Sequence, residues 1–218
     1  MYSLQLIKIE YDIKTAKTDK EKAAKITWKN EWVNSILRGL GKETSPFTIT
    51  ILLTQYLTKM ASVLRFLTAF PYTHASIGLS EDRNTFYIFV KKGFIVEMVT
   101  RFHKPDRAPF PCALYELPVP EAVYHRIKAV LQAFEARKSE LRYTHRSMLL
   151  SLLLYIPYER KDCYFCSHFV AEVLQRGNWL HQEKDSILYL PRDFTRLPGV
   201  RQVFRGELLG LSRHYGLA

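Results

Sequence analysis

The sequence predicts an α+β fold, in which a group of strands and several amphipathic helices occupy separate stretches of the chain. Three short apolar segments over residues 72–99, separated by turn-prone residues at 80–84 and 91–93, are typical of a β-meander. Residues 121–138 carry apolar side chains at helical spacing, and a second such pattern begins at Cys166. With 218 residues, of which 47% are hydrophobic, the chain has room for one good core.

Residues 1–45 are expected to form an N-terminal extension, a short strand followed by a helix that ends near Gly39 and Gly41. This helix would be basic and amphipathic, because the segment 14–29 is rich in lysine and the apolar residues Trp28, Trp32 and Ile36 follow one another at four-residue spacing. Such a helix can lie on a membrane surface. The favoured reading is that its stripe packs on the protein and its lysines are solvated.

Residues 46–218 are expected to form the main domain. Its first element is a helix in the second half of the apolar stretch 46–70, which leads into the strands at 72–79, 85–90 and 94–99. A loop rich in Pro and Arg at 103–111 precedes a strand at 113–117, the helix at 121–138 and a helical stretch at 143–155. The chain from residue 191 is expected to be loop-rich and to cover one side of the site.

The helix that begins at Cys166 points to a reactive thiol. Phe169 and Val173 form an apolar pair four residues apart, and Gly177 stands at the position of a C-terminal cap. A cysteine in the first turn of a helix faces unpaired backbone N–H groups and the positive end of the helix dipole. Both favour the thiolate over the thiol.

A thiol nucleophile also needs a base, and His74 on the first meander strand is the candidate. A histidine on a strand that faces a cysteine at a helix N-terminus is the Cys–His arrangement of thiol hydrolases. Each residue also has an ordinary structural interpretation, since many buried cysteines act as small hydrophobic residues and most strand histidines are structural.

These residues resemble a known family. The resemblance rests on Thr73-His74-Ala75-Ser76-Ile77, on Tyr87 and Phe89, on Gly93-Phe94 and Val96-Glu97, and on Cys166-Ser167-x-Phe169-Val170-Ala171. Together they resemble the circularly permuted NlpC/P60 group of papain-like proteins, which includes YiiX/YebB-type proteins and lecithin:retinol acyltransferase-like enzymes. The histidine strand precedes the cysteine helix in that group, as it does here, and the resemblance spans roughly residues 46–196. It implies a permuted papain-like fold, a small antiparallel β-sheet packed against helices with the nucleophile at a helix N-terminus.

The resemblance also implies a Cys–His–polar triad, whose third member is assigned to Glu97. Glu97 matches the Val-Glu of the YiiX-like pattern and would orient His74. Alternatively Glu97 is an ordinary residue of the opposite strand face, and the hydroxyl of Tyr87 would then fix the ring. Close relatives carry a Tyr-Ser-Phe stretch where this chain has Tyr87-Ile88-Phe89, so substrate contacts are expected to differ there.

Other interpretations of the cysteines and histidines are weaker. His168 lies two residues after Cys166, about 200° around the helix, and therefore faces away from the thiol. Cys163-x-x-Cys166 spells a redox motif, but the upstream stretch reads as helical rather than as a strand of a βαβ unit. A zinc site from Cys163, Cys166, His168 and His74 would crowd its ligands. No cofactor and no metal are expected, and Cys112 is expected to be a strand residue without chemistry.

The expected function is that of a cysteine hydrolase, an amidase or thiol peptidase. Cys166 would attack an amide or ester carbonyl, with His74 first holding the thiolate as an ion pair and then protonating the leaving group. Glu97 would orient His74, and the Cys166 N–H would stabilise the oxyanion. The resemblance implies a small amide, a peptide or an acyl lipid as substrate. The alternatives are a lipid acyltransferase or phospholipase-type enzyme, or a non-catalytic lipid- or peptide-binding module.

The net charge of +11 predicts attraction to anionic surfaces, which include lipid headgroups. Nothing resembles a nucleic-acid-binding motif, so no nucleic acid is expected as a partner. The N-terminus lacks the layout of a signal peptide, and three cysteines do not suggest a disulfide framework. The longest apolar run, residues 148–156, is well short of the about 20 residues of a membrane span. A cytoplasmic location is expected, with peripheral contact with an anionic membrane as an open alternative.

Overall fold

The computed structural model describes residues 47–56, 59–102, 110–180 and 184–217, together with Thr18, Lys22 and Lys25. The chain divides into two compact units, Met1–Ser45 and Pro46–Ala218. The expected N-terminal strand lies outside the described residues, as does most of the loop at 103–111. Of the expected basic helix, Lys22 and Lys25 are described, both helical, and Trp28 is not. The named strands and helices belong to the second unit.

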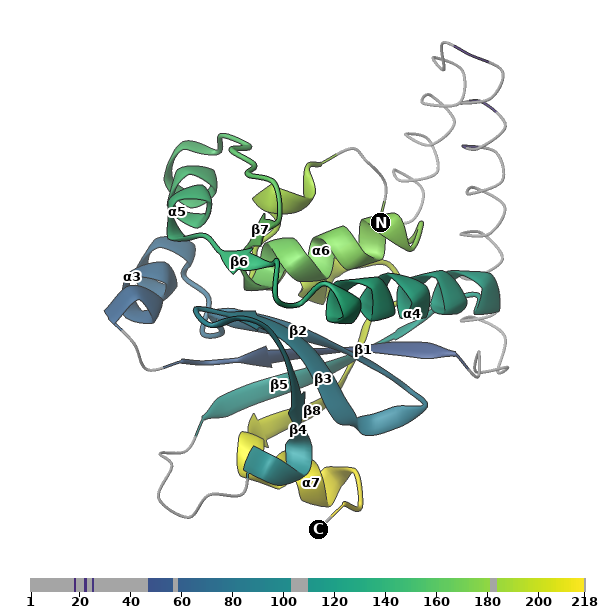
Figure 1. The fold of residues 1–218 in the computed structure, drawn as a ribbon. Helices are drawn as coiled ribbons and strands as arrows, with labels where there is room; N and C mark the ends of the chain where they lie inside the picture. The colour runs from purple at the N-terminus through teal and green to yellow at the C-terminus, as the bar shows by residue number, and fades with distance from the viewer. Residues whose placement is uncertain are drawn as a thin grey trace. The chain divides into compact units, whose positions relative to one another are not determined.

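An antiparallel β-sheet is the centre of this unit (Figure 1), and its described strands have the order β4-β3-β2-β1-β5-β8. These strands are β1 Thr48–Thr54, β2 His74–Leu79, β3 Asp82–Val90, β4 Gly93–Met98, β5 Pro111–Pro118 and β8 Arg201–Glu207. Each pairs antiparallel with its neighbours. The structure thus confirms the α+β class, and the meander β2-β3-β4 forms where the sequence predicts it.

Helices cover the two faces of this sheet (Figure 1). The helices are α3 Lys59–Thr68, α4 Glu121–Ala136, α5 His145–Leu154, α6 Cys166–Arg176 and α7 Leu208–His214, with 3-10 turns η1 Val99–Phe102, η2 Ser186–Leu188 and η3 Pro191–Arg196. On one face, Ile77 of the sheet is buried with Leu131 of α4 and Phe169 of α6. On the other face, Leu52 and Leu114 are buried with Leu211 of α7. None of the described helices is long and apolar enough to cross a membrane.

Two strands of the sheet differ from the sequence-based expectation. The first half of the stretch 46–70, for which we predicted no strand, forms β1 between β2 and β5. The end of the chain, expected to be loop-rich, instead forms β8 and α7 over residues 201–214. β8 lies at the sheet edge and its side chains are mostly exposed or half-buried. An exposed edge strand does not need the apolar alternation that reveals other strands.

Helix α6 is buried along nearly its whole length, and Gly177 forms its C-cap as the sequence predicts. Gly177 has a right-handed φ of −71°, so this position does not require glycine for its backbone angles. It requires glycine for space, because a Cβ there would lie 2.3 Å from Cγ1 of Ile127 on α4. The close approach of α4 and α6 therefore depends on Gly177.

Gly177→Ala is accordingly expected to lower the free energy of unfolding by about 1–3 kcal/mol through overpacking against Ile127. Urea denaturation of the variant and the wild type measures this change. In the double variant with Ile127→Ala, the loss should be smaller than the sum of the two single losses. Strict additivity would show that the two residues do not compete for the same space.

Candidate active site

Cys166 is the first residue of α6 and its side chain is 6% exposed. The backbone N–H groups of Ala75, Ser167 and Cys166 itself hydrogen-bond to the sulfur, and each lowers the pKa of the thiol. Burial has the larger, opposite effect, so the pKa of Cys166 is raised overall. The thiol donates to the carbonyl oxygen of Thr73, with Sγ 3.9 Å away.

The thiol lies beside a segment of β2 that does not pair with β3. The described pairing of β2 with β3 covers only Ile77 to Leu79. The backbone N–H of Ser80 donates to the Thr48 carbonyl of β1. In this register the backbone N–H and C=O groups of the even-numbered residues of β2 point to β1, and those of the odd-numbered residues point to β3. The Ala75 N–H therefore points to the edge that β3 no longer covers. Thr73, just before β2, departs from this alternation because its N–H donates to Thr54 of β1, while its carbonyl accepts from the thiol. Cys166 bonds to the Ala75 N–H and to the Thr73 carbonyl.

His74 lies between these two backbone contacts, as the first residue of β2, and is 5% exposed. Burial lowers the pKa of its imidazole to about 4. Within the described part of the chain, its buried Nε2 has no hydrogen-bond partner. The ring packs against Tyr56, with 4.8 Å between ring centroids. The structure thus places the thiol of Cys166 against the backbone on both sides of His74.

Thr54 of β1 is the residue directly opposite His74. Residues paired in this way carry their side chains on the same sheet face. The buried Thr54 hydroxyl, like His74 Nε2, has no hydrogen-bond partner among the described residues. Two buried polar atoms without a described partner therefore belong to paired residues of β1 and β2.

The register does not bring Glu97 to His74. Glu97 pairs with Phe86 of β3, and Phe86 pairs with Gly78 of β2. Glu97 is therefore two strands from β2 and four residues along it from His74, separations of about 10 Å and about 13 Å by strand geometry. The expected orienting role of Glu97 has no geometric support.

Tyr87, the fallback for this role, is also displaced from the histidine. It pairs with Ile77, three residues along β2 from His74. Ile77 belongs to the core cluster under α4 and α6, and Tyr87 packs against the same cluster. Alternation along β2 puts His74 on the other face of the sheet.

Tyr143 is a site residue that sequence reasoning missed. It belongs to β6, Arg142–Tyr143, which pairs in parallel with β7, Cys163–Tyr164. Burial, and then the nearby Cys166 thiol, raise the pKa of the Tyr143 hydroxyl. Its hydroxyl also donates to the sulfur of Met148, 3.6 Å away. Tyr143 thus adds a neutral hydroxyl donor near the thiol, and no motif in the sequence marks it.

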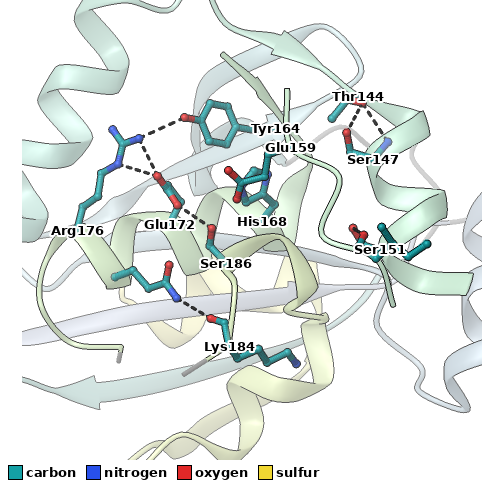
Figure 2. Close-up of polar contacts among 12 residues, drawn as sticks. Thr144, Ser147, Ser151, Glu159, Tyr164, His168, Glu172, Arg176, Lys184 and Ser186 are labelled. Atoms are coloured by element: carbon teal, nitrogen blue, oxygen red, sulfur yellow. Dashed lines mark hydrogen bonds and ion pairs between the residues drawn. The ribbon is translucent and has the colours of Figure 1, made fainter. Parts of the chain in front are cut away.

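A separate polar network surrounds His168 and Glu172 (Figure 2). Glu172 forms an ion pair with Arg176, 2.7 Å apart, and accepts a hydrogen bond from the Ser186 hydroxyl at 2.7 Å. These contacts tie α6 to η2. His168 packs on the Tyr164 ring, with 4.9 Å between centroids, and its Nε2 is 3.9 Å from Glu159.

Burial lowers the pKa of His168 to about 4. The charge of Arg176 also lowers this pKa, whereas the charge of Glu172 raises it. At neutral pH the contact with Glu159 therefore joins a neutral imidazole to a carboxyl group. It is a polar contact and not an ion pair. The described contacts of His168 are with this network and with the ring of Phe165.

Comparison with models of protein families, with curated proteins and with solved structures found no match to this chain. In the part of the chain that the structure describes, no group of three or more His, Cys, Asp or Glu side chains is arranged to hold a metal ion. Cys112 lies buried in β5, and burial raises its pKa to about 12.

Proposed function

We propose that the second unit is a cysteine hydrolase of permuted papain-like fold, in which Cys166 is the nucleophile and His74 its base. The observation that carries the proposal is the position of the thiol. It lies at the N-terminus of α6, accepts hydrogen bonds from three backbone N–H groups and contacts the residues on both sides of His74.

Burial sets the protonation states from which the reaction starts. It raises the pKa of Cys166 and lowers that of His74 to about 4, so the pair rests as a neutral thiol and a neutral imidazole. This differs from the ion pair expected from the sequence. In the proposed step, Sγ bonds to the substrate carbonyl carbon while His74 accepts the thiol proton. The protonated His74 then donates this proton to the leaving amine or alkoxide.

The oxyanion formed in that step needs hydrogen-bond donors. The backbone N–H groups at the start of α6 supply them, and the Tyr143 hydroxyl is a further donor near the thiol. Thr54, and not Glu97, is the residue opposite His74, and we assign the orientation of the imidazole to the Tyr56 ring that packs against it. Water hydrolyses the resulting thioester, which releases the acid and returns the proton to Cys166 through His74.

The substrate class follows from the resemblance, as a small amide, a peptide or an acyl lipid. If an alcohol or amine replaces water in the second step, the same site is an acyltransferase. The near-complete burial of Cys166 favours a second candidate, a binding module in which the thiol is unused.

An acylation experiment separates these functions. Incubation with a p-nitrophenyl ester, followed by peptide mass analysis, is expected to show acyl transfer to Cys166 in preference to Cys163. Cys163 is the matched control, because it is less buried and would react first if exposure alone decided. In Cys166→Ala the site-specific acylation should disappear. Labelling of Cys163 alone would favour the binding module.

A further inference from the structure

The second unit exposes large apolar side chains on two neighbouring segments. On α3, Phe66 is 87% exposed and Val63 is about half exposed. On α5 and the chain after it, the exposed side chains are Leu149, Leu154, Tyr155, Ile156 and Tyr158. Tyr155 takes a left-handed φ of 53° as the C-cap of α5, and this conformation ends the helix where the exposed apolar run begins. Single exposed apolar residues are ordinary, but a concentration of this kind marks an interaction surface.

Both segments rest on the same small core. Leu64 of α3 packs against the cluster that contains Met148 of α5 and Phe165. Figure 1 shows α3 and α5 at the same end of the second unit. Phe165 directly precedes Cys166, so the two exposed segments flank the start of the cysteine helix. We call the exposed side chains of residues 63–66, 149 and 154–158 the α3–α5 surface.

The charges within this surface are positive, and the acid Glu159 borders it. Residues 59–70 and 141–158 contain no Asp or Glu, whereas Arg65 and Arg146 lie among the apolar positions. Arg146 is exposed, and the exposed Arg160 and Lys161 follow the apolar run, with Glu159 as the nearest acid. Aromatic and aliphatic side chains interspersed with cations match an anionic bilayer.

We propose that the α3–α5 surface docks on an anionic phospholipid bilayer. Phe66 and the residues 154–158 enter the interface between headgroups and acyl chains, while Arg65 and Arg146 face the lipid phosphates. The net charge of +11 draws the chain to such a membrane. This inference does not rest on the chemistry of Cys166. It uses different residues from the basic N-terminal helix.

Co-sedimentation of the full chain with vesicles tests the proposal. We expect binding to vesicles of phosphatidylcholine with phosphatidylserine, weaker binding to phosphatidylcholine alone, and a loss of binding as salt is raised. Phe66→Ser with Tyr155→Ser should lower the partition coefficient at least roughly tenfold, because two exposed apolar side chains no longer enter the interface. Val96→Ser with Met98→Ser is the control, since these exposed residues lie on β4. The control should bind like the wild type.

Two results would overturn the proposal. The first is the absence of wild-type binding to the anionic vesicles. The second is equal binding by the Phe66/Tyr155 variant and the wild type, which would assign membrane binding to another part of the chain. Circular dichroism of each variant shows that a loss of binding is not a loss of fold. Acylation of Cys166 by the ester probe, measured without vesicles, is expected to be unchanged in the surface variants.

Discussion

His74→Gln is expected to slow the acylation of Cys166 by roughly 10²–10⁴-fold, the usual contribution of a general base. Glutamine is polar and of similar size, but it cannot accept the thiol proton. The burial that raises the pKa of Cys166 makes this loss severe, because the thiol in the folded protein does not ionise readily at neutral pH. The rate of ester-probe acylation at Cys166, followed by mass spectrometry, measures the effect.

His168→Gln is the matched control for this measurement. His168 is 3% exposed and burial lowers its pKa to about 4, as at His74, yet its described contacts lie in the network around Glu159 and Tyr164. Acylation should therefore continue near the wild-type rate in His168→Gln. Equal rates in His74→Gln and the wild type would remove His74 from the mechanism. Equal losses in both variants would point to a structural effect of replacing any buried histidine.

The second large effect is a loss of stability in acid. The pKa values of His74 and His168 are lowered from 6.5 to about 4 in the folded state. Between these values the unfolded chain binds more protons than the folded one, so the free energy of unfolding falls as pH falls from 6.5 towards 4. Each histidine is expected to contribute about 3 kcal/mol to this fall, and the full stability is present above pH 6.5.

Urea unfolding at a series of pH values measures this slope. Replacement of either buried histidine by glutamine should remove about half of the histidine-dependent fall. His125→Gln, at an exposed position on α4, should leave the fall unchanged. A wild-type protein equally stable above and below this pH window would show that neither histidine is held neutral by burial.

Much of this fold could be predicted from local patterns. The meander and the helices α4 and α6 combine clear periodicity with clear turn and cap residues, such as Gly177. β1 was missed because Thr48–Thr54 lies inside the apolar stretch 46–70 and is buried on both faces, and periodicity alone does not separate a buried strand from a buried helix. β8 was missed for the opposite reason, since an exposed edge strand carries little apolar pattern.

The candidate site could be predicted only in part. Cys166 and His74 each stand at a recognisable position, a helix start and a strand start, and the structure places the thiol against the backbone of the residues on both sides of His74. The position of Glu97 depends on the register of two successive pairings, including an irregularity between Gly78 and Leu79 that no residue pattern reveals. Tyr143 and Thr54 reach the site only through tertiary packing, so no local signal identifies them.

The bond from Cys166 to Thr73 joins residues 93 positions apart in the chain. Closing so long a loop is entropically costly and is compensated only when the intervening strands and helices have packed. The hairpins and helices between them can form from near neighbours, whereas the thiol reaches its backbone partners only at the end. The arrangement that the proposed chemistry needs therefore forms late during folding, and partly folded chains have their helices without the thiol in its place.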